Sequence, residues 1–336
     1  MRPYLNFLPL VLLTALAGCG GSPGGTSSAV TPSASRGAVA PESSAGDAIC
    51  GFDAAGLPTF AAVGSDRKKW TVYRSKDEPL YDIPVAGASD SRPGAVSGKF
   101  VVGTYDLPDD TYGVLVATRG ADGTVTVAAY PGYGLSACDG GRALLFDAAF
   151  DGDNPPRFLL NLATGAITPE PVPAGYEPVA MRGRFAVCVT NPSGGALVYD
   201  VDADTSVSLQ AAEGSDGKVW ANAVNSKGQA LGLTFEGDRK DLRLWSASGV
   251  PGAPLDSVTG GYLDAGWLSD DARRLTYDKV VDGSATAYMQ VGSVVSVLRT
   301  DAFALGSLRG LNPKGTIGFG LDSDLGANVA VSVSYR

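Results

Sequence analysis

A tight turn followed by an apolar strand recurs along this chain at a nearly constant interval, and this repeat constrains the fold more than any other feature. The clearest copies span residues 225–231, 269–277 and 312–319. In these copies Asn or Ser opens the turn by bonding its own backbone, and Gly occupies the position that needs a positive φ in the first and third copies, with Ala272 in the second. Fainter copies begin near Asp53, Ser97, Cys138 and Arg182.

The turn positions are spaced by 42, 42, 43, 45, 44 and 43 residues, which is typical of a blade-like repeat. Each unit also holds further strand-like runs, such as 112–116 and 124–127 in one unit and 287–291 and 294–297 in another. Four short strands per unit predict an all-β fold, a β-propeller of seven blades of about 43 residues, because single blades must stack to bury both faces. The turn positions are Gly56, Gly98, Gly140, Gly183, Gly228, Ala272 and Gly315.

The blade count and the closure of the ring leave alternatives open. Six or eight blades, or a pair of β-sandwiches with irregular turns, would also use many short strands. Only 21 residues follow Gly315, enough for two strands and not three. The last blade therefore either has three strands or is completed by a strand from the other end of the chain, for which residues 37–40 are the nearest candidate.

The first 18 residues resemble a lipoprotein signal peptide. The apolar stretch 5–17 is too short to span a bilayer, and it ends in Leu16-Ala17-Gly18-Cys19, which resembles the lipobox of bacterial lipoproteins. The resemblance implies that Cys19 becomes the first mature residue and carries a diacylglycerol and a further acyl chain such as palmitate. Two or three acyl chains hold a protein stably on a membrane. We therefore expect an extracytoplasmic protein of the cell envelope, anchored through Cys19.

Composition divides the rest of the chain in two. Residues 19–46 are rich in Gly, Ser, Ala, Pro and Thr, which predicts a flexible tether with a reach of roughly 30 Å. Residues 47–336 contain the repeats and form the predicted propeller domain. The clearest repeat also resembles the Ser-Pro-Asp-Gly-x-x-Leu-x-Tyr/Phe turn of TolB-type and WD-like propellers, through Ser269, Asp271, Leu275 and Tyr277, with Asp270 and Ala272 departing from the pattern.

A second resemblance joins residues 225–231 and 242–245 to the Asn-x-x-Gly-Gln…Leu-Trp pattern of extracellular HAF-type repeats. Both resemblances imply a propeller and no particular activity, because such propellers serve as scaffolds, sensors and enzymes. The formal net charge of −9 argues against nucleic acid as a partner, which would need clustered Lys and Arg.

The composition of the chain gives little indication of a catalytic site or a metal site. The chain has no histidine, which excludes a Ser-His-Asp triad and any His-containing metal site. Asp200, Asp202 and Asp204 alternate like the opening of a calcium loop, but Thr205 and Ala211 stand where that loop needs Gly and Glu. We therefore expect a solvated turn there, and we expect no catalytic residue, metal ligand or cofactor.

Cysteine and tryptophan supply the remaining site candidates. Of the three cysteines left after lipidation, Cys138 and Cys188 lie in neighbouring units and are the candidate disulfide, which leaves Cys50 as an odd thiol. Trp220 and Trp267 fall on or beside innermost strands and are candidate ligand contacts at the mouth of the central channel. Trp70 and Trp245 fall on third strands, where packing between blades is expected.

The sequence thus predicts a binding or scaffolding module whose partner is an envelope protein, a peptide or a glycan. One alternative is a carboxylate-based, glycan-active enzyme, which would need two or three acidic side chains converging at one channel mouth. The other is a structural component of envelope assembly, which would form a stoichiometric complex with a neighbour.

Overall fold

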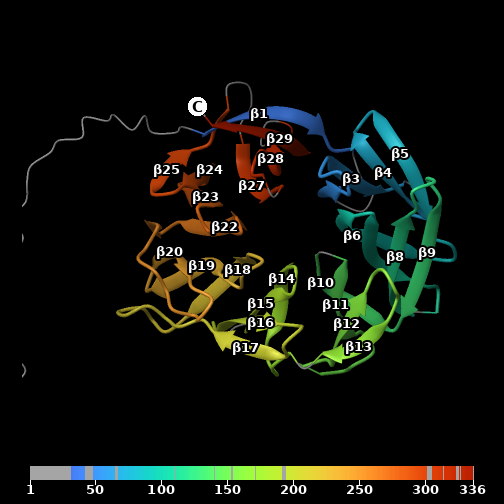
Figure 1. Cartoon of the computed structure of the whole chain (residues 1–336), viewed down its shortest axis with the longest axis horizontal. Coiled ribbons are helices and arrows are strands. Elements are labelled where there is room, and N and C mark those ends of the chain that lie inside the picture. Colours follow the sequence, from blue (N-terminus) through green and yellow to red (C-terminus); the bar gives the residue numbers. More distant parts are fainter. Residues whose placement is uncertain are drawn as a thin grey trace, which may run out of the picture.

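The computed structural model describes residues 32–41, 48–64, 67–109, 111–139, 141–152, 154–170, 172–190, 194–312, 314–322, 325 and 327–335, apart from 301–304. Cys19 and the predicted signal peptide lie outside these residues. Twisted antiparallel sheets are arranged around a central axis (Figure 1). Among the described residues no helix has the length and apolar character needed to cross a membrane.

Blades 1 to 3 each consist of four consecutive strands, the first strand innermost and the fourth outermost (Figure 1). Blade 1 contains β2 (Ile49–Asp53), β3 (Pro58–Val63), β4 (Lys69–Ser75) and β5 (Glu78–Pro84). Blade 2 contains β6 (Asp90–Gly98), β7 (Phe100–Asp106), β8 (Tyr112–Arg119) and β9 (Val125–Pro131). Blade 3 contains β10 (Tyr133–Asp139), β11 (Arg142–Asp147), β12 (Arg157–Asn161) and β13 (Ile167–Glu170).

Blades 4 to 6 repeat this pattern, and blade 7 departs from it. Blade 4 contains β14 (Glu177–Arg182), β15 (Phe185–Val189), β16 (Ala196–Asp200) and β17 (Thr205–Ser208). Blade 5 contains β18 (Val219–Val224), β19 (Ala230–Glu236), β20 (Arg239–Trp245) and β21 (Asp256–Thr259). Blade 6 contains β22 (Tyr262–Leu268), β23 (Arg274–Val281), β24 (Ser284–Val291) and β25 (Val294–Val297). Blade 7 contains β27 (Leu305–Leu311), β28 (Ile317–Asp322), β29 (Ala327–Tyr335) and β1 (Pro32–Val39), with β26 (Arg299–Thr300) at its outer edge.

The seven blades of the sequence prediction are confirmed, and the repeated turn proves to join the first strand of each blade to the second. Six of the turn residues have a positive φ, from 54° at Ala272 to 76° at Gly228. Gly140 lies outside the described residues. These turns all lie at one end of the strands, which we call the turn face. The loops between second and third strands and the connections between blades form the opposite end, which we call the connection face.

Strand β1 closes the ring by adding the fourth strand to blade 7 (Figure 1). It runs antiparallel to β29, with Pro32 opposite Tyr335 and Arg36 opposite Val331. Composition assigns residues 32–39 to the tether, but the free edge of β29 supplies the backbone partners that the segment lacks by itself. The structure therefore places these residues in the folded ring, and of the two ways to end blade 7 it uses the strand from the other terminus.

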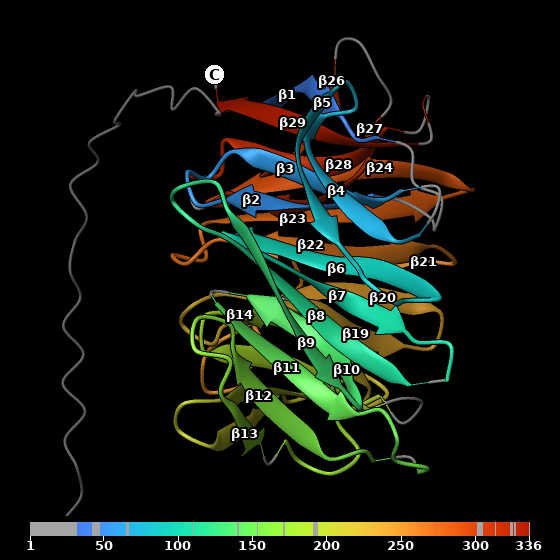
Figure 2. The same ribbon diagram turned by 90° about the vertical axis from the view of Figure 1, so that its right-hand side faces the viewer.

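The hydrophobic core is divided among the contacts between blades. Seven clusters occur among the described residues, and each joins one neighbouring pair of blades, including blades 7 and 1. Trp70 and Trp245, on the third strands β4 and β20, are fully buried in two of these clusters. Figure 2 shows the sheets of successive blades side by side, each twisted against the next.

Blades 1 and 2 are joined more closely than a stacking contact requires. Their innermost strands pair in parallel, with Gly51 opposite Val96 and Asp53 opposite Gly98, so that the two blades form one eight-stranded sheet. A Cβ at position 51 would overlap the carbonyl oxygen of Val96, so this approach requires glycine.

Candidate functional site

The two tryptophans predicted to meet a ligand lie on innermost strands but point into the packing between blades. Trp267 on β22 is 8 % exposed and belongs to the core between blades 6 and 7. Trp220 on β18 packs against the core between blades 4 and 5. A β-bulge at Gly266 shifts the register just before Trp267, and such a bulge redirects the following side chains. The structure does not bring the two indoles together at a channel mouth.

The candidate disulfide between Cys138 and Cys188 is not formed, and both residues are free thiols. Cys138 packs in the cluster between blades 2 and 3, whereas Cys188 packs in the cluster between blades 3 and 4. The sheet of blade 3 therefore separates the two sulfur atoms. Burial raises the pKa of each thiol to about 12, which makes both poor nucleophiles.

The alternating aspartates of blade 4 are held by protein partners. Asp200 forms an ion pair with Arg184 at 3.3 Å, and Asp202 forms one with Arg142 of blade 3. Asp204 accepts a hydrogen bond from Tyr199 at 2.9 Å. Among the described residues no group of three or more Cys, Asp or Glu side chains could hold a metal ion.

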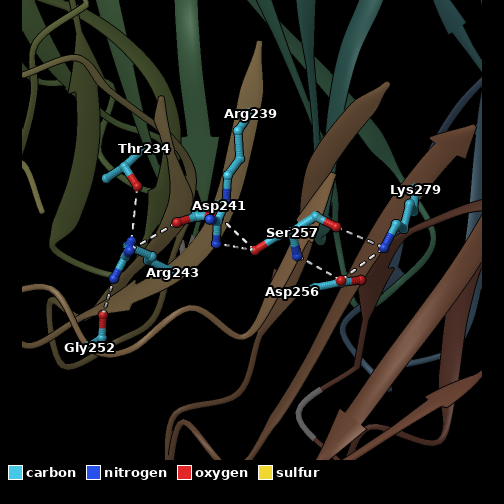
Figure 3. Close-up of polar contacts among 8 residues, drawn as sticks. All are labelled: Thr234, Arg239, Asp241, Arg243, Gly252, Asp256, Ser257 and Lys279. Atoms are coloured by element: carbon cyan, nitrogen blue, oxygen red, sulfur yellow. Dashed lines mark hydrogen bonds and ion pairs between the residues drawn. The ribbon is translucent and has the colours of Figure 1, made fainter. Parts of the chain in front are cut away.

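A dense polar network ties blade 5 to blade 6 (Figure 3). Asp241 on β20 is 8 % exposed and accepts hydrogen bonds from Arg239 Nε at 2.8 Å, Arg243 Nη2 at 3.0 Å and Ser257 Oγ at 2.7 Å. Lys279 of blade 6 donates to Asp256 Oδ1 and to the carbonyl of Ser257, both at 2.9 Å.

Two further nitrogen atoms of Arg243 also have partners. Its Nε donates to Thr234 Oγ1 at 2.9 Å, and its Nη1 donates to the carbonyl of Gly252 at 2.8 Å (Figure 3). Each carboxylate and guanidinium of the network is thus matched inside the protein. We assign the network to holding the outer strand β21 in place, because groups that are already paired offer little to a ligand.

A groove on the connection face, between blades 3 and 4, has the opposite character. Its larger half is a pocket of about 480 Å³, and its smaller half is a pocket of about 220 Å³. The halves share five lining residues, so they are parts of one groove. The shared residues are Asn154, Pro155, Arg157, Gly175 and Tyr176.

The loops that flank the groove explain its walls. The larger half is formed by the loop between β11 and β12 and by the connection from β13 to β14, and both segments are rich in proline. Proline fixes φ and offers no backbone donor, so these walls are stiff and largely apolar. The prolines that line this half are Pro155, Pro156, Pro169 and Pro173.

Arg157 lies where the two halves meet. It begins β12 on the same face as Leu159, two residues on, and Leu159 packs into the core between blades 3 and 4. Its Nη1 donates to Ser136 Oγ at 2.9 Å, and its guanidinium lies 5.5 Å from the centre of the Phe146 ring. Ser136 lies within the β-bulge of β10.

Among the described residues, Ser136 is the one hydrogen-bond acceptor of the Arg157 guanidinium, so several of its donors are unused there. No ion pair within 4.0 Å joins it to a carboxylate in the part of the chain that the structure describes. Burial lowers the pKa of Arg157. The negative charge of Glu177 raises it, although the two groups form no ion pair within 4.0 Å. Arginine keeps its charge at neutral pH even so, and its planar fork is suited to a carboxylate or phosphate.

A second pocket, of about 420 Å³, lies on the channel side of blades 7, 1 and 2. The residues that line it are Ala48, Ile49, Cys50, Gly94, Ser307, Gly310, Phe319, Gly320, Leu321 and Asn328. None of these is acidic, so this part of the channel does not contain the converging carboxylates that an enzyme of the predicted alternative class would need.

Comparison with known proteins supports the propeller fold and indicates no specific function. No family model matches the chain, and no curated protein matches its sequence. Among solved structures it is similar to the WD40 repeats of RRP9, at 12 % identity and a TM-score of 0.54, over 89 % of this chain and 100 % of that one. It is also similar to the propeller domain of Cps50 (Swd1) from Myceliophteria thermophila, at 10 % identity and a TM-score of 0.50, over 86 % and 96 % of the two chains.

A further similarity is to prolyl oligopeptidase B from Galerina marginata, at 15 % identity and a TM-score of 0.51. It covers 85 % of this chain and 46 % of that one. The chain is a β-propeller. At these identities the likeness extends to the fold alone, and the function must be argued from the site.

The groove residues Arg157, Tyr176 and Glu177 are not among the site candidates that the sequence predicts. The sequence does contain an indication of the groove, because a cluster of prolines directly precedes Arg157 and another lies shortly before Glu177. What the sequence could not show is that the two clusters meet across a blade boundary, since residues 154–157 and 173–177 belong to different loops.

Proposed function

We propose that this chain is a lipid-anchored, extracytoplasmic β-propeller that acts as a binding module of the bacterial cell envelope, with the groove between blades 3 and 4 as its ligand site. The observation that carries the proposal is Arg157, a half-buried guanidinium at the centre of a preformed groove, whose donors are only partly used by the described residues. Clefts with stiff apolar walls and a few polar groups are the usual form of a ligand site. Arg157 calls for a ligand with a carboxylate or another oxyanion.

The lipid anchor is supported by the lipobox-like segment that ends at Cys19. Replacing Cys19 with Ala is expected to abolish acyl incorporation and to release the protein from the membrane fraction. A variant that is still processed and still fractionates with membranes would contradict the anchor, while leaving the groove unaffected.

The binding role is tested by crosslinking and pull-down from intact envelopes, comparing the wild-type protein with Arg157→Gln. Arg92→Gln is the matched control, because it removes an equal charge from a side chain that is 64 % exposed in blade 2. We expect Arg157→Gln to lose the captured partner and Arg92→Gln to retain it. Equal capture by all three proteins would overturn the groove as the ligand site.

For the enzyme alternative we consider a pocket of about 230 Å³ on the connection face of blade 2, which two aspartates line. Asp90 and Asp106 lie opposite each other there on β6 and β7. Asp90 already forms ion pairs with Arg67 at 3.3 Å and Arg92 at 3.4 Å. Carboxylate-based glycoside hydrolysis needs two carboxyl groups flanking the substrate, so this pairing favours binding over hydrolysis. The assembly alternative predicts a stoichiometric partner whose capture is independent of Arg157.

A further inference from the structure

The smaller half of the groove presents one cation and one anion to the same cavity. Arg157 from β12 and Glu177, the first residue of β14, both line the pocket of about 220 Å³. They belong to neighbouring blades. No ion pair within 4.0 Å joins them, although Glu177 is close enough to act on Arg157 through its charge. The two side chains therefore face a common space in which neither neutralises the other.

The arrangement distinguishes between kinds of anion. A simple carboxylate that binds Arg157 also comes under the repulsion of Glu177, whereas a ligand with an adjacent ammonium group gains from both charges. The remaining walls offer the rings of Phe146 and Tyr176 and the side chain of Val189. An aromatic ring also favours a nearby cation.

The size of the pocket limits the group that enters it. A volume of about 220 Å³ corresponds to roughly seven waters at about 30 Å³ each. This space suits an amino-acid-sized end group and not a folded partner. The rest of a longer ligand would then continue into the larger half, along its proline-rich wall.

We infer that the smaller half of the groove recognises the zwitterionic end of an amino acid or amino-acid-containing ligand, its carboxylate held by Arg157 and its ammonium group by Glu177. This inference rests on the proposed ligand-binding role of the groove and specifies the chemistry of its ligand. Glu177 is then the residue that determines specificity, since it separates α-amino acids from other carboxylates.

The test uses the full-length protein in mild detergent with three small probes: alanine, lactate and alanine amide. Lactate replaces the ammonium group with a hydroxyl at nearly the same size, and alanine amide removes the carboxylate. Binding is followed through the ¹⁵Nε signal of Arg157, which is assigned by its loss in Arg157→Lys. We expect lactate to bind about fivefold more weakly than alanine, the upper range for a solvent-exposed ion pair. Alanine amide should bind at least about tenfold more weakly.

The matched variant is Glu177→Gln, which keeps the shape of the side chain and removes its charge. We expect alanine and lactate to bind this variant equally well, and we expect its thermal stability to match the wild type because Glu177 is exposed. Equal binding of alanine and lactate by the wild type would overturn the inference and leave an Arg157 carboxylate site standing. Pull-down that depends on Arg157 while no probe shifts its signal would also overturn the inference and leave the proposed function intact. Failure of both the probes and the pull-down would overturn both.

Discussion

Ala272 and Gly228 occupy the same turn position in blades 6 and 5, and both have a positive φ, 54° and 76°. A side chain with a Cβ pays about 1–2 kcal/mol in this region of backbone space. We expect Ala272→Gly to stabilise the protein by about 0.5–1 kcal/mol, because the relief of strain exceeds the added entropy of the unfolded chain. Chemical denaturation measures the change.

The reciprocal substitution, Gly228→Ala, is the control for this turn position. It should destabilise by about 1–2 kcal/mol, because the new Cβ would be strained and would also lie 3.1 Å from Phe185 Cε1. Changes of the same sign in both variants would contradict the common turn conformation.

The raised pKa of Glu170 predicts a pH dependence of stability with an unusual sign. It is buried, and together with Asp204 it hydrogen-bonds the phenol of Tyr199. A phenol has one proton, so both contacts are satisfied when a protonated Glu170 donates to Tyr199 and Tyr199 donates to Asp204. Burial raises the pKa of Glu170 above its ordinary value of 4.5; a hydrogen bond from Tyr199 to the ionised carboxylate opposes the rise, and the charges of Asp204 and Asp202 add to it.

A carboxyl group whose pKa is raised by folding contributes stability that is complete below its unfolded pKa and is lost as the pH rises through its folded pKa. We therefore expect Glu170→Gln, whose amide donates at every pH, to flatten the decline in the free energy of unfolding above pH 4.5. Urea denaturation between pH 4.5 and pH 8 compares it with the wild type, and Glu177→Gln is the exposed control. If the free energy of unfolding changed with pH in the same way for the wild type and Glu170→Gln, a protonated Glu170 that donates to Tyr199 would be contradicted.

At the scale of elements, the network around Asp241 and Asp256 adds side-chain contacts to the backbone pairing of β21 with the third strand of blade 5, and it links β21 to blade 6. Burial by itself would raise the pKa of Asp241, but the hydrogen bonds from Ser257 and Arg239 outweigh it and lower the pKa. The stability that Asp241 contributes is thus present above its unfolded pKa and is lost as the pH falls, the reverse of Glu170.

Asp241→Ala should destabilise the protein by about 2–4 kcal/mol, because it leaves the guanidinium of Arg243, only 13 % exposed, without its carboxylate. Lys69→Ala is the control, since the pair of Lys69 with Asp82 at 2.8 Å is largely exposed and is worth less than about 1 kcal/mol. Guanidinium denaturation measures both. A loss of equal size in the two variants would remove the distinction between network and surface pair.

The elements that the sequence predicts best are those with a local cause. The turns between first and second strands follow from Asn, Asp, Ser and Gly chemistry within a few residues. Strand β1 is different, because residues 32–39 have the composition of a linker and become a strand only where β29 offers its edge. At the bulge in β22, a Cβ on Gly266 would overlap the carbonyl oxygen of Leu308 in blade 7, a contact that only the stacking of the blades creates.

At the scale of the whole molecule, the joint between β1 and β29 closes the ring. Ser33 and Ser334 lie opposite each other there, with their Oγ atoms 2.8 Å apart. The double substitution Ser33→Cys and Ser334→Cys should form a disulfide and stabilise the oxidised protein by about 2–4 kcal/mol, because it closes a very long loop. Thermal unfolding with and without reductant measures the gain.

The single variant Ser33→Cys is the control for this joint and should show no dependence on reductant. Thiols that stay free in the oxidised double variant would contradict the register of β1 on β29. The native thiols Cys138 and Cys188 should not interfere, because burial keeps both protonated.

The sequence by itself determined the seven-fold repeat, the position of each turn and the all-β class, because these depend on residues close together in the chain. It also indicated the lipobox-like segment at Cys19, which lies outside the described residues. Only the tertiary structure decided that β1 closes the ring, that Cys138 and Cys188 face different cores and that Trp267 packs between blades. It alone brought Arg157 and Glu177 to one cavity, because that meeting depends on how blade 3 stacks against blade 4.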